Sequence, residues 1–215
     1  MKVVSTNYST LLKLCTVTLL LLLTAKVAKA THVYGADLFY THVSGNTYTV
    51  EMYVYGDCAG AAFSSLPGAP VVEVYNGTSL FTTLSLTVQA PTNGLEVTPV
   101  CPSQAGNTKC SNPSNALPGV KRFYYKSTVT LNTTSANWLF RFTGSMTTHS
   151  LGRSTQMTNI NNSTGNSLMV LEATLNNSSA PNSSPVFTTI PTPFYCINKA
   201  AQYNPGTVNT DNDSL

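Results

Sequence analysis

Five cysteines are the residues of this chain with the clearest capacity for covalent chemistry. Cys15 lies in an apolar N-terminal run, whereas Cys58, Cys101, Cys110 and Cys196 are spread over the polar remainder. An even number of cysteines in an oxidising compartment predicts disulfide bonds. Zinc binding is disfavoured because the spacing contains no Cys-x-x-Cys pair.

The four cysteines after the apolar run allow three disulfide connectivities. Cys101 and Cys110 lie in one loop rich in proline, serine and asparagine, which favours a bond between them. Cys58 and Cys196 would then join the early strands to the end of the domain. On the chain-entropy model, a bridge that closes so long a loop contributes about 4–5 kcal/mol to stability.

Oxygen-bearing side chains alternate near the end of the sequence, at Asn209, Asp211 and Asp213. Such alternation suits a hard cation, so calcium is the one cofactor that the sequence suggests. A following domain would have to supply further ligands. The competing interpretation is a solvated turn, where Asn and Asp are common.

Catalytic residues do not form a recognisable set. Serine and threonine are abundant, but no Gly-x-Ser-x-Gly elbow is present, and no carboxylate pair has the pattern of a glycosidase. His32 and His42 would be about 33 Å apart on one extended strand, at about 3.3 Å per residue. With His149, they are interpreted as ordinary surface histidines, and the chain is predicted not to be an enzyme.

Aromatic residues at alternate positions could provide a sugar-stacking platform. Trp138, Phe140 and Phe142 share one face of a predicted strand, and Tyr124 and Tyr125 occur nearby. Strand aromatics at period two more often pack in the core, which is the prediction for the Trp138 face. On another strand, Tyr53 and Tyr55 have the opposite parity to Tyr48, Val50, Met52 and Val54. They are therefore predicted to be exposed and to be ligand contacts.

Residues 1–30 have the layout of a secretory signal peptide. A polar start with Lys2 and Lys13 leads into an apolar run, and the segment closes with Ala28-Lys29-Ala30. The apolar run of about 11 residues is too short for a bilayer, which requires about 20. The mature chain is therefore expected to begin at Thr31, to be secreted or located at the cell surface, and to lack a transmembrane segment.

Charge and composition narrow the class of protein. The chain carries a formal +3, but four of its 11 basic residues lie in the leader, so the mature part has seven against eight acidic residues, about −1. No nucleic-acid partner is expected from such a balance. Threonine, tyrosine and valine favour strands, and asparagine, glycine, proline and serine favour turns. The prediction is an all-β, antiparallel β-sandwich-like domain over 31–180 with disulfide-clasped loops.

Period-two patterns predict the individual strands. The clearest prediction is a hairpin of 33–43 with 47–55, and a second hairpin pairs strands over 71–75 and 80–88 across a turn at Asn76-Gly77. The remaining strands are predicted over 122–131, 138–142, 167–175, 186–189, 194–197 and 201–203. Because 90–119 contains many prolines, it is predicted to be a loop.

Several short motifs occur together in a known order. His32 to Tyr40 resembles an opening strand of the type H-x-x-G-G-x-x-x-Y, and Tyr55-Gly56-Asp57-Cys58 resembles Y-R-D-C, with glycine in place of arginine. Asn182-Ser183-Ser184-Pro185 resembles N-S-S-P, and Asn209 to Leu215 resembles an acidic D-x-D-G-D-S-L segment. This set is similar to the N-terminal region of large exported surface proteins of gliding bacteria.

The resemblance implies a larger protein with PKD-like or cadherin-like repeats, gliding motility and type IX secretion. It implies that 181–215 is a linker and the start of a following β-domain, which would be truncated in this sequence. The expected function is a non-catalytic structural or adhesion domain at the cell surface; the alternative is a carbohydrate-binding module of a secreted enzyme. The expected partners are other domains of the same polypeptide, surface proteins or glycans.

Overall fold

The computed structural model describes residues 33–59, 68–146, 169–190 and 202–211, together with Lys13, Thr16, Asn198 and Ala200. Apart from Lys13 and Thr16, the predicted signal peptide lies outside the described residues. The same is true of His32, His149, Cys196, Asp213 and the strand predicted over 194–197. No helix in the described part of the chain has the length and hydropathy of a membrane span.

The first sheet contains the predicted N-terminal hairpin. Its order is β1-β2-β7-β5, with β6 also paired to β7, and every pairing is antiparallel. The strands are β1 (Val33–Ser44), β2 (Thr47–Asp57), β5 (Thr87–Val88), β6 (Leu95–Glu96) and β7 (Val120–Thr130). Both long hairpin strands and β7 were predicted and are confirmed.

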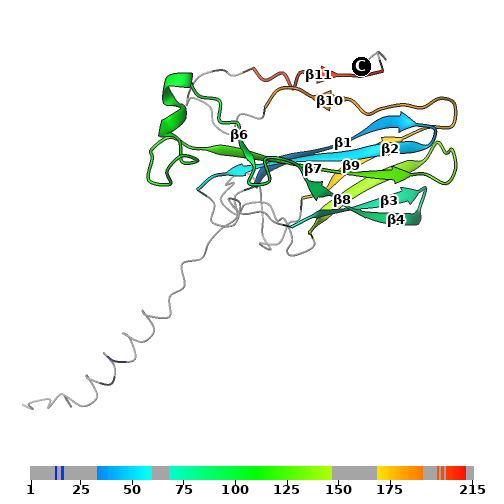
Figure 1. Cartoon of the computed structure of the whole chain (residues 1–215), viewed down its shortest axis with the longest axis horizontal. Helices are drawn as coiled ribbons and strands as arrows, with labels where there is room; N and C mark the ends of the chain where they lie inside the picture. Colours follow the sequence, from blue (N-terminus) through cyan, green and yellow to red (C-terminus); the bar gives the residue numbers. More distant parts are fainter. Residues whose placement is uncertain are drawn as a thin grey trace, which may run out of the picture.

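The second sheet has the order β4-β3-β8-β9 and is also antiparallel. Its strands are β3 (Pro70–Asn76), β4 (Ser79–Ser85), β8 (Trp138–Met146) and β9 (Leu171–Leu175), and a separate hairpin pairs β10 (Val186–Phe187) with β11 (Thr207–Val208). In Figure 1 the two sheets overlie each other, with β1 and β9 along the same edge and β10–β11 beyond that edge. The predicted antiparallel β-sandwich is confirmed.

Alternation along each strand builds the core between the sheets. In β2, Tyr48, Val50, Met52 and Val54 are completely buried, while the residues between them face outward. Burying a large apolar side chain stabilises the fold by about 1.5–3 kcal/mol. The second sheet contributes the side chains that complete this core: Val72, Val74, Trp138, Phe140, Phe142, Met146 and Leu175.

Turn chemistry connects the strands of the second hairpin. Gly77 adopts a φ of 59°, which a glycine accepts without strain, and the predicted Asn76-Gly77 turn between β3 and β4 is confirmed. The single strand predicted over 80–88 is wrong. Leu86 is buried in the core, and the chain passes there from β4 in one sheet to β5 in the other.

The later strands are shorter than the sequence suggests. The strand predicted over 186–189 is β10, which ends at Phe187 and pairs with Thr207 and Val208 of β11; the amides of Thr188 and Thr189 still bond to the Gly206 and Pro205 carbonyls. The strand predicted over 201–203 is wrong for Gln202 and Tyr203, which form no ladder. The prediction of a loop over 90–119 holds apart from the two-residue β6 and a 3₁₀ helix at Pro102–Asn107.

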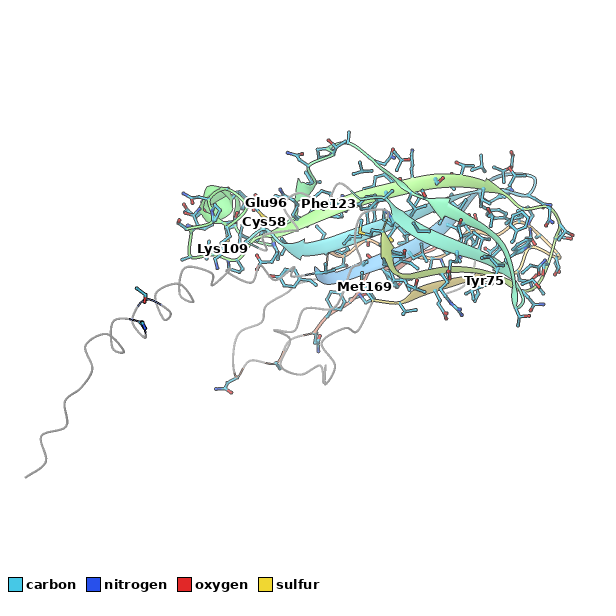
Figure 2. All side chains as sticks on the ribbon, turned by 90° about the horizontal axis from the view of Figure 1, so that it is seen from below. Cys58, Tyr75, Glu96, Lys109, Phe123 and Met169 are labelled. Carbon is cyan, nitrogen blue, oxygen red and sulfur yellow. A yellow bond between two sulfur atoms is a disulfide. The ribbon has the colours of Figure 1, made fainter. Side chains whose placement is uncertain are left out.

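The disulfide joins Cys58 to Cys110, with their Cα atoms 4.8 Å apart. Both predicted pairings, Cys101–Cys110 and Cys58–Cys196, are therefore wrong. The loop before β7 folds back on the end of β2, where the Cys58 amide donates to the Gly119 carbonyl at 3.1 Å. Cys101, in contrast, is an exposed thiol. Figure 2 shows Cys58, Glu96 and Lys109 together at one end of the sandwich, far from Tyr75.

Candidate functional site

Asn209 and Asp211, two of the proposed calcium ligands, accept hydrogen bonds from other groups of the protein. The Asp211 carboxylate accepts hydrogen bonds from the backbone amide of Ser183 and, at 3.2 Å, from its hydroxyl. Asn209 Oδ1 accepts a hydrogen bond from the backbone amide of Asp211 at 2.8 Å. Within the described residues, no group of three potential metal ligands occurs. Calcium binding stays a prediction, because Asp213 lies outside the described residues.

Residues 181–190 and 202–211 form a strap along the edge of β1. The amide of Ser184 donates to the Tyr40 carbonyl at 2.9 Å, and the Tyr40 amide donates to the Ser184 hydroxyl at 2.8 Å. The His42 amide donates to the Ser183 hydroxyl at 3.1 Å. These bonds occupy edge groups of β1 that would otherwise be open to another strand.

The hairpin at the centre of the strap is tightly built. The amide and hydroxyl of Thr188 both donate to the Gly206 carbonyl, at 3.1 and 2.7 Å. Gly206 has a φ of 62°, and an added Cβ would lie 2.5 Å from the Thr188 hydroxyl and 2.7 Å from that of Thr189. Only glycine satisfies both conditions, so the hairpin holds β10 in a fixed position.

A cleft of about 760 Å³ is lined by residues of the strap, β1 and β9. Its apolar lining includes Leu38, Tyr40, Ala173, Pro185 and Phe187. Polar groups complete the wall: Glu172, Thr174, Asn182, Ser183, Ser184, Thr207 and Asn209.

Three of the lining residues differ in how their side chains are bonded and exposed. The Tyr40 hydroxyl donates to the Thr174 carbonyl at 2.8 Å and connects the two sheets. Burial, followed by the effects of Tyr48 and Asp211, raises the pKa of Tyr40 to about 12. Asn182 Oδ1 is buried without a hydrogen-bond partner among the described residues, whereas the Phe187 side chain is 47% exposed.

The predicted ligand contacts Tyr53 and Tyr55 lie on the outer face of the first sheet, but they differ in exposure. Tyr55 is only 2% exposed, so its predicted exposure is wrong. Burial raises its pKa, as does the nearby Asp37, while Arg122 opposes the shift. The Tyr53 ring is partly exposed, and the Arg122 guanidinium lies 4.5 Å from its centroid.

Tyr124 extends the outer aromatic cluster onto β7. Its ring centroid lies 5.1 Å from that of Tyr53, and Phe39 approaches Tyr53 from the other side at 5.3 Å. The Tyr124 hydroxyl donates to Glu51, which also accepts the Thr41 hydroxyl at 3.2 Å. Burial, then the bond to Glu51, raises the pKa of Tyr124. These contacts join β1, β2 and β7 across the outer face.

The other aromatic candidates belong to the core. Trp138 is 1% exposed, and Phe140, Phe142 and Tyr125 are completely buried, which confirms the prediction for the Trp138 face. His42 bonds through its ring Nε2 to the Gly45 carbonyl at 2.9 Å and has a local structural role.

No family model matches the chain, and no curated protein or solved structure is significantly similar to it. The resemblance to exported surface proteins of gliding bacteria therefore stays a prediction. So do the repeats, the secretion route and the domain division at residue 181.

Sequence reasoning did not identify the cleft. Phe187 and Asn182 lie about 145 residues after β1 in the chain, and no local pattern indicates that they return to its edge. The available signal was Ser183-Ser184, two small hydroxyl residues before a proline, which can substitute for strand partners.

Proposed function

We propose that this chain is an exported, non-catalytic domain with a structural or adhesive role at the cell surface. The Cys58–Cys110 disulfide carries the proposal. It links the end of β2 to the loop before β7 in a domain whose β1 edge is covered by the strap. Disulfides persist in oxidising environments and strengthen exported domains.

Three carboxylates support a structural role. Glu51 accepts a hydrogen bond from the Tyr124 hydroxyl, and Glu172 forms a salt bridge with Arg141 at 2.7 Å. The Asp211 carboxylate accepts a hydrogen bond from the Ser183 amide. Each of these carboxylates stabilises a contact between strands or between the two segments of the strap. A general acid or base would instead be directed toward a substrate.

Export is the expectation from the sequence prediction of a leader over residues 1–30. Release after Ala30 would give a mature chain that begins at Thr31. Its partners would be other domains of the same polypeptide, surface proteins or glycans. A folded head of this kind would resist proteolysis and hold its contact surface away from the cell.

The proposal is tested in the cells that produce the protein. A membrane-impermeant biotin reagent should label the chain on intact cells, and N-terminal sequencing should begin at Thr31. Deleting the coding sequence should reduce attachment to surfaces without slowing growth. A cytoplasmic product with an intact leader and reduced Cys58 and Cys110 would contradict the proposal.

A second candidate is a carbohydrate-binding module of a secreted enzyme. The neighbouring Tyr53 and Tyr124 rings on the outer face favour it, because partly exposed aromatic rings can contact sugars. A pull-down with insoluble polysaccharides tests this candidate. Binding that is lost in Tyr53→Ala, with the fold intact, would place the contact on this face.

A further inference from the structure

We infer that the cleft beneath the strap binds an extended, uncharged segment of another protein, which pairs with the edge of β1 beside Leu38. The inference rests on the adhesive function proposed above and names its class of partner. The cleft has a volume of about 760 Å³, within the range of ligand pockets, about 300–1,000 Å³. It is therefore large enough for a few residues of an extended chain.

Alternation along β1 identifies the backbone groups that remain open. The Tyr40 and His42 amides point away from β2, because they donate to the hydroxyls of Ser184 and Ser183. In an antiparallel ladder, every second residue turns its amide and carbonyl toward the same side. The amide and carbonyl of Leu38, two positions before Tyr40, therefore also point away from β2. Among the described residues, neither the strap nor β9 pairs with them.

Pro185 accounts for the open edge at Leu38. Ser183 lies at His42 and Ser184 at Tyr40, so the strap runs antiparallel to β1. Proline has no amide to donate, and its ring interrupts strand pairing. After Pro185 the strap pairs with itself, as β10 with β11, rather than with β1. The strap therefore leaves the Leu38 groups available within the cleft.

The apolar seam between the two sheets is incompletely covered at the same edge, where β1 and β9 lie together (Figure 1). Ala36 and Leu38 on β1, with Leu171 and Ala173 on β9, pack against the core but are only partly buried. A strand added beside β1 would turn every second side chain toward this seam. Apolar side chains at alternate positions would complete its cover.

Phe187 provides a further apolar contact on the strap side of the cleft. Its side chain lines the cleft and is 47% exposed, although it lies in the β10–β11 hairpin, which fixes its backbone. Covering an exposed aromatic ring with an apolar side chain favours binding. The site therefore combines an open strand edge with apolar surface on both sides.

The charges of the cleft favour an uncharged segment. None of the described lining residues is a lysine, arginine or histidine. Glu172 is the one carboxylate of this lining, and Arg141 Nε binds it at 2.7 Å. A basic side chain would compete with Arg141 for Glu172, and an acidic one would find no cation in the lining.

The open edge is the feature that selects a polypeptide. Exposed sheet edges bind extended peptides by adding a strand: main-chain hydrogen bonds hold the peptide, and contacts to alternate side chains select its sequence. The amide and carbonyl of Leu38 match the repeat of a peptide backbone. A sugar has no donors and acceptors at this spacing, and the apolar seam offers little to its hydroxyls.

Hydrogen exchange of the free mature chain tests the edge itself. We expect the Leu38 amide to exchange at least about tenfold faster than the Tyr40 amide, which is bonded to Ser184. Equal protection of the two amides would show that the Leu38 edge is already occupied in the folded chain, and the inference would fail.

Binding is tested with blocked hexapeptides labelled with fluorescein and added to the full mature chain. The neutral probe alternates threonine and valine; the charged members alternate lysine or glutamate with valine. Fluorescence anisotropy should show tighter binding of the neutral probe, and the unlabelled probe should slow exchange at Leu38. Two further probes carry N-methyl groups on all threonine or on all valine amides. Only one of these two should lose binding, because a strand paired along one edge uses every second amide.

Two variants of the cleft complete the test. Phe187→Ala should weaken the Thr-Val probe by about tenfold, through loss of the ring contact. Leu38→Pro removes the open amide at a position where an edge strand accepts proline, and should weaken the probe by at least about tenfold. Thermal denaturation checks both variants. Phe187→Ala keeps the test valid if Leu38→Pro unfolds, since the exposed ring contributes little to the core.

Leu80→Ala is the matched control, because Leu80 is 54% exposed on β4 at the opposite edge of the second sheet. It should bind the probe as the unchanged protein does. Protection of β4 amides by the probe, with none at Leu38, would move the site to the wrong edge and overturn the inference.

Each remaining outcome also contradicts the inference in a distinguishable way. Equal binding of both N-methylated probes would show that no ladder forms, and preference for a charged probe would overturn the uncharged class. A soluble β-1,4-glucan bound in place of the peptides, and lost in Phe187→Ala, would make the cleft a sugar site. Protection of Leu38 that rises with protein concentration, together with dimers in light scattering, would make the partner a second copy. If the neutral probe does not bind at millimolar concentration, the cleft inference fails, while surface labelling and attachment still test the adhesive function.

Discussion

Gly119 lies directly against Cys110: a Cβ on Gly119 would be 2.6 Å from the Cys110 sulfur and 2.7 Å from its backbone nitrogen. It would also lie 3.2 Å from the Cys58 Cβ. The neighbouring atoms are backbone and a cross-linked side chain, so they cannot move aside easily. We expect Gly119→Ala to lower the free energy of unfolding by about 1–3 kcal/mol, the usual range for overpacking, as measured by urea denaturation.

Gly106→Ala is the control for this substitution. Gly106 lies in the 3₁₀ helix of the same loop, and an added Cβ would meet no atom within 4 Å. Its effect should remain within about 0.5 kcal/mol, as for most surface changes. Equal losses for the two alanine variants would show that Gly119 is not packed against the disulfide.

The disulfide connectivity predicts distinct reactivities for the cysteines. Under native, non-reducing conditions a maleimide should label Cys101, which is exposed, and should leave Cys58 and Cys110 unmodified. Peptide mapping should recover a cross-linked peptide that contains Cys58 and Cys110. A peptide linking Cys101 to Cys110, or Cys58 to Cys196, would contradict the structure.

Removing this disulfide should be costly. The bond spans 52 positions, for which the chain-entropy model gives about 4 kcal/mol. We expect the Cys58→Ser, Cys110→Ser double variant to lose most of that stability in urea denaturation, whereas Cys101→Ser should change little. A double variant as stable as the unchanged protein would show that the bond contributes nothing.

Much of the fold could be predicted because its strands carry local signals. β2 alternates buried and outward-facing residues along most of its length, and Gly77 marks a tight turn. The passage of the chain between the two sheets at Leu86 could not be predicted. A single buried leucine gives the same sequence pattern whether the strand continues or the chain passes to the other sheet. The disulfide was missed for a related reason: nearness of Cys101 and Cys110 in sequence does not specify which sulfur faces β2.

The candidate site was less predictable because it depends on contacts between distant segments. Parity correctly placed Tyr53 on the outer face, but it could not show that Asp37 and Arg122 approach the neighbouring Tyr55. The alternation of Asn209 and Asp211 suggested a cation. In the structure, the Asp211 carboxylate accepts a hydrogen bond from the Ser183 amide, which only the folded strap brings near.

The bond between Ser183 and Asp211 should stabilise the strap. Ser183→Ala removes the hydroxyl that accepts from the His42 amide and donates to Asp211. Because it leaves partly buried groups with fewer partners, we expect a loss of about 1–3 kcal/mol in the free energy of unfolding. Hydrogen exchange should show a less protected His42 amide.

Ser178→Ala is the control, since Ser178 is exposed and bonds within its own turn to Asn176. It should change neither stability nor the protection of His42. A Ser183→Ala protein with unchanged exchange at His42 would show that the strap does not hold β1 through this hydroxyl. Asp211→Asn, which keeps an acceptor but removes the charge, should have a smaller effect than Ser183→Ala on the His42 amide.

Alkaline pH should unfold the protein partly through Tyr40. Its pKa is raised to about 12 from an ordinary value of 10, chiefly by burial, so the folded state retains a proton that the unfolded state releases. The stabilising effect of the neutral hydroxyl is complete below about pH 10 and is lost progressively as pH rises toward 12. Urea denaturation at about pH 8, 10 and 11 should therefore show a falling free energy of unfolding.

The Tyr40→Phe variant has no hydroxyl that can ionise at this position. It loses the bond to the Thr174 carbonyl and should be less stable at pH 8, but its free energy of unfolding should fall less steeply with pH. Tyr34, whose pKa is also raised to about 12, continues to contribute to the decline in that variant. Identical slopes for the two proteins would show that Tyr40 is not protected from ionisation in the fold.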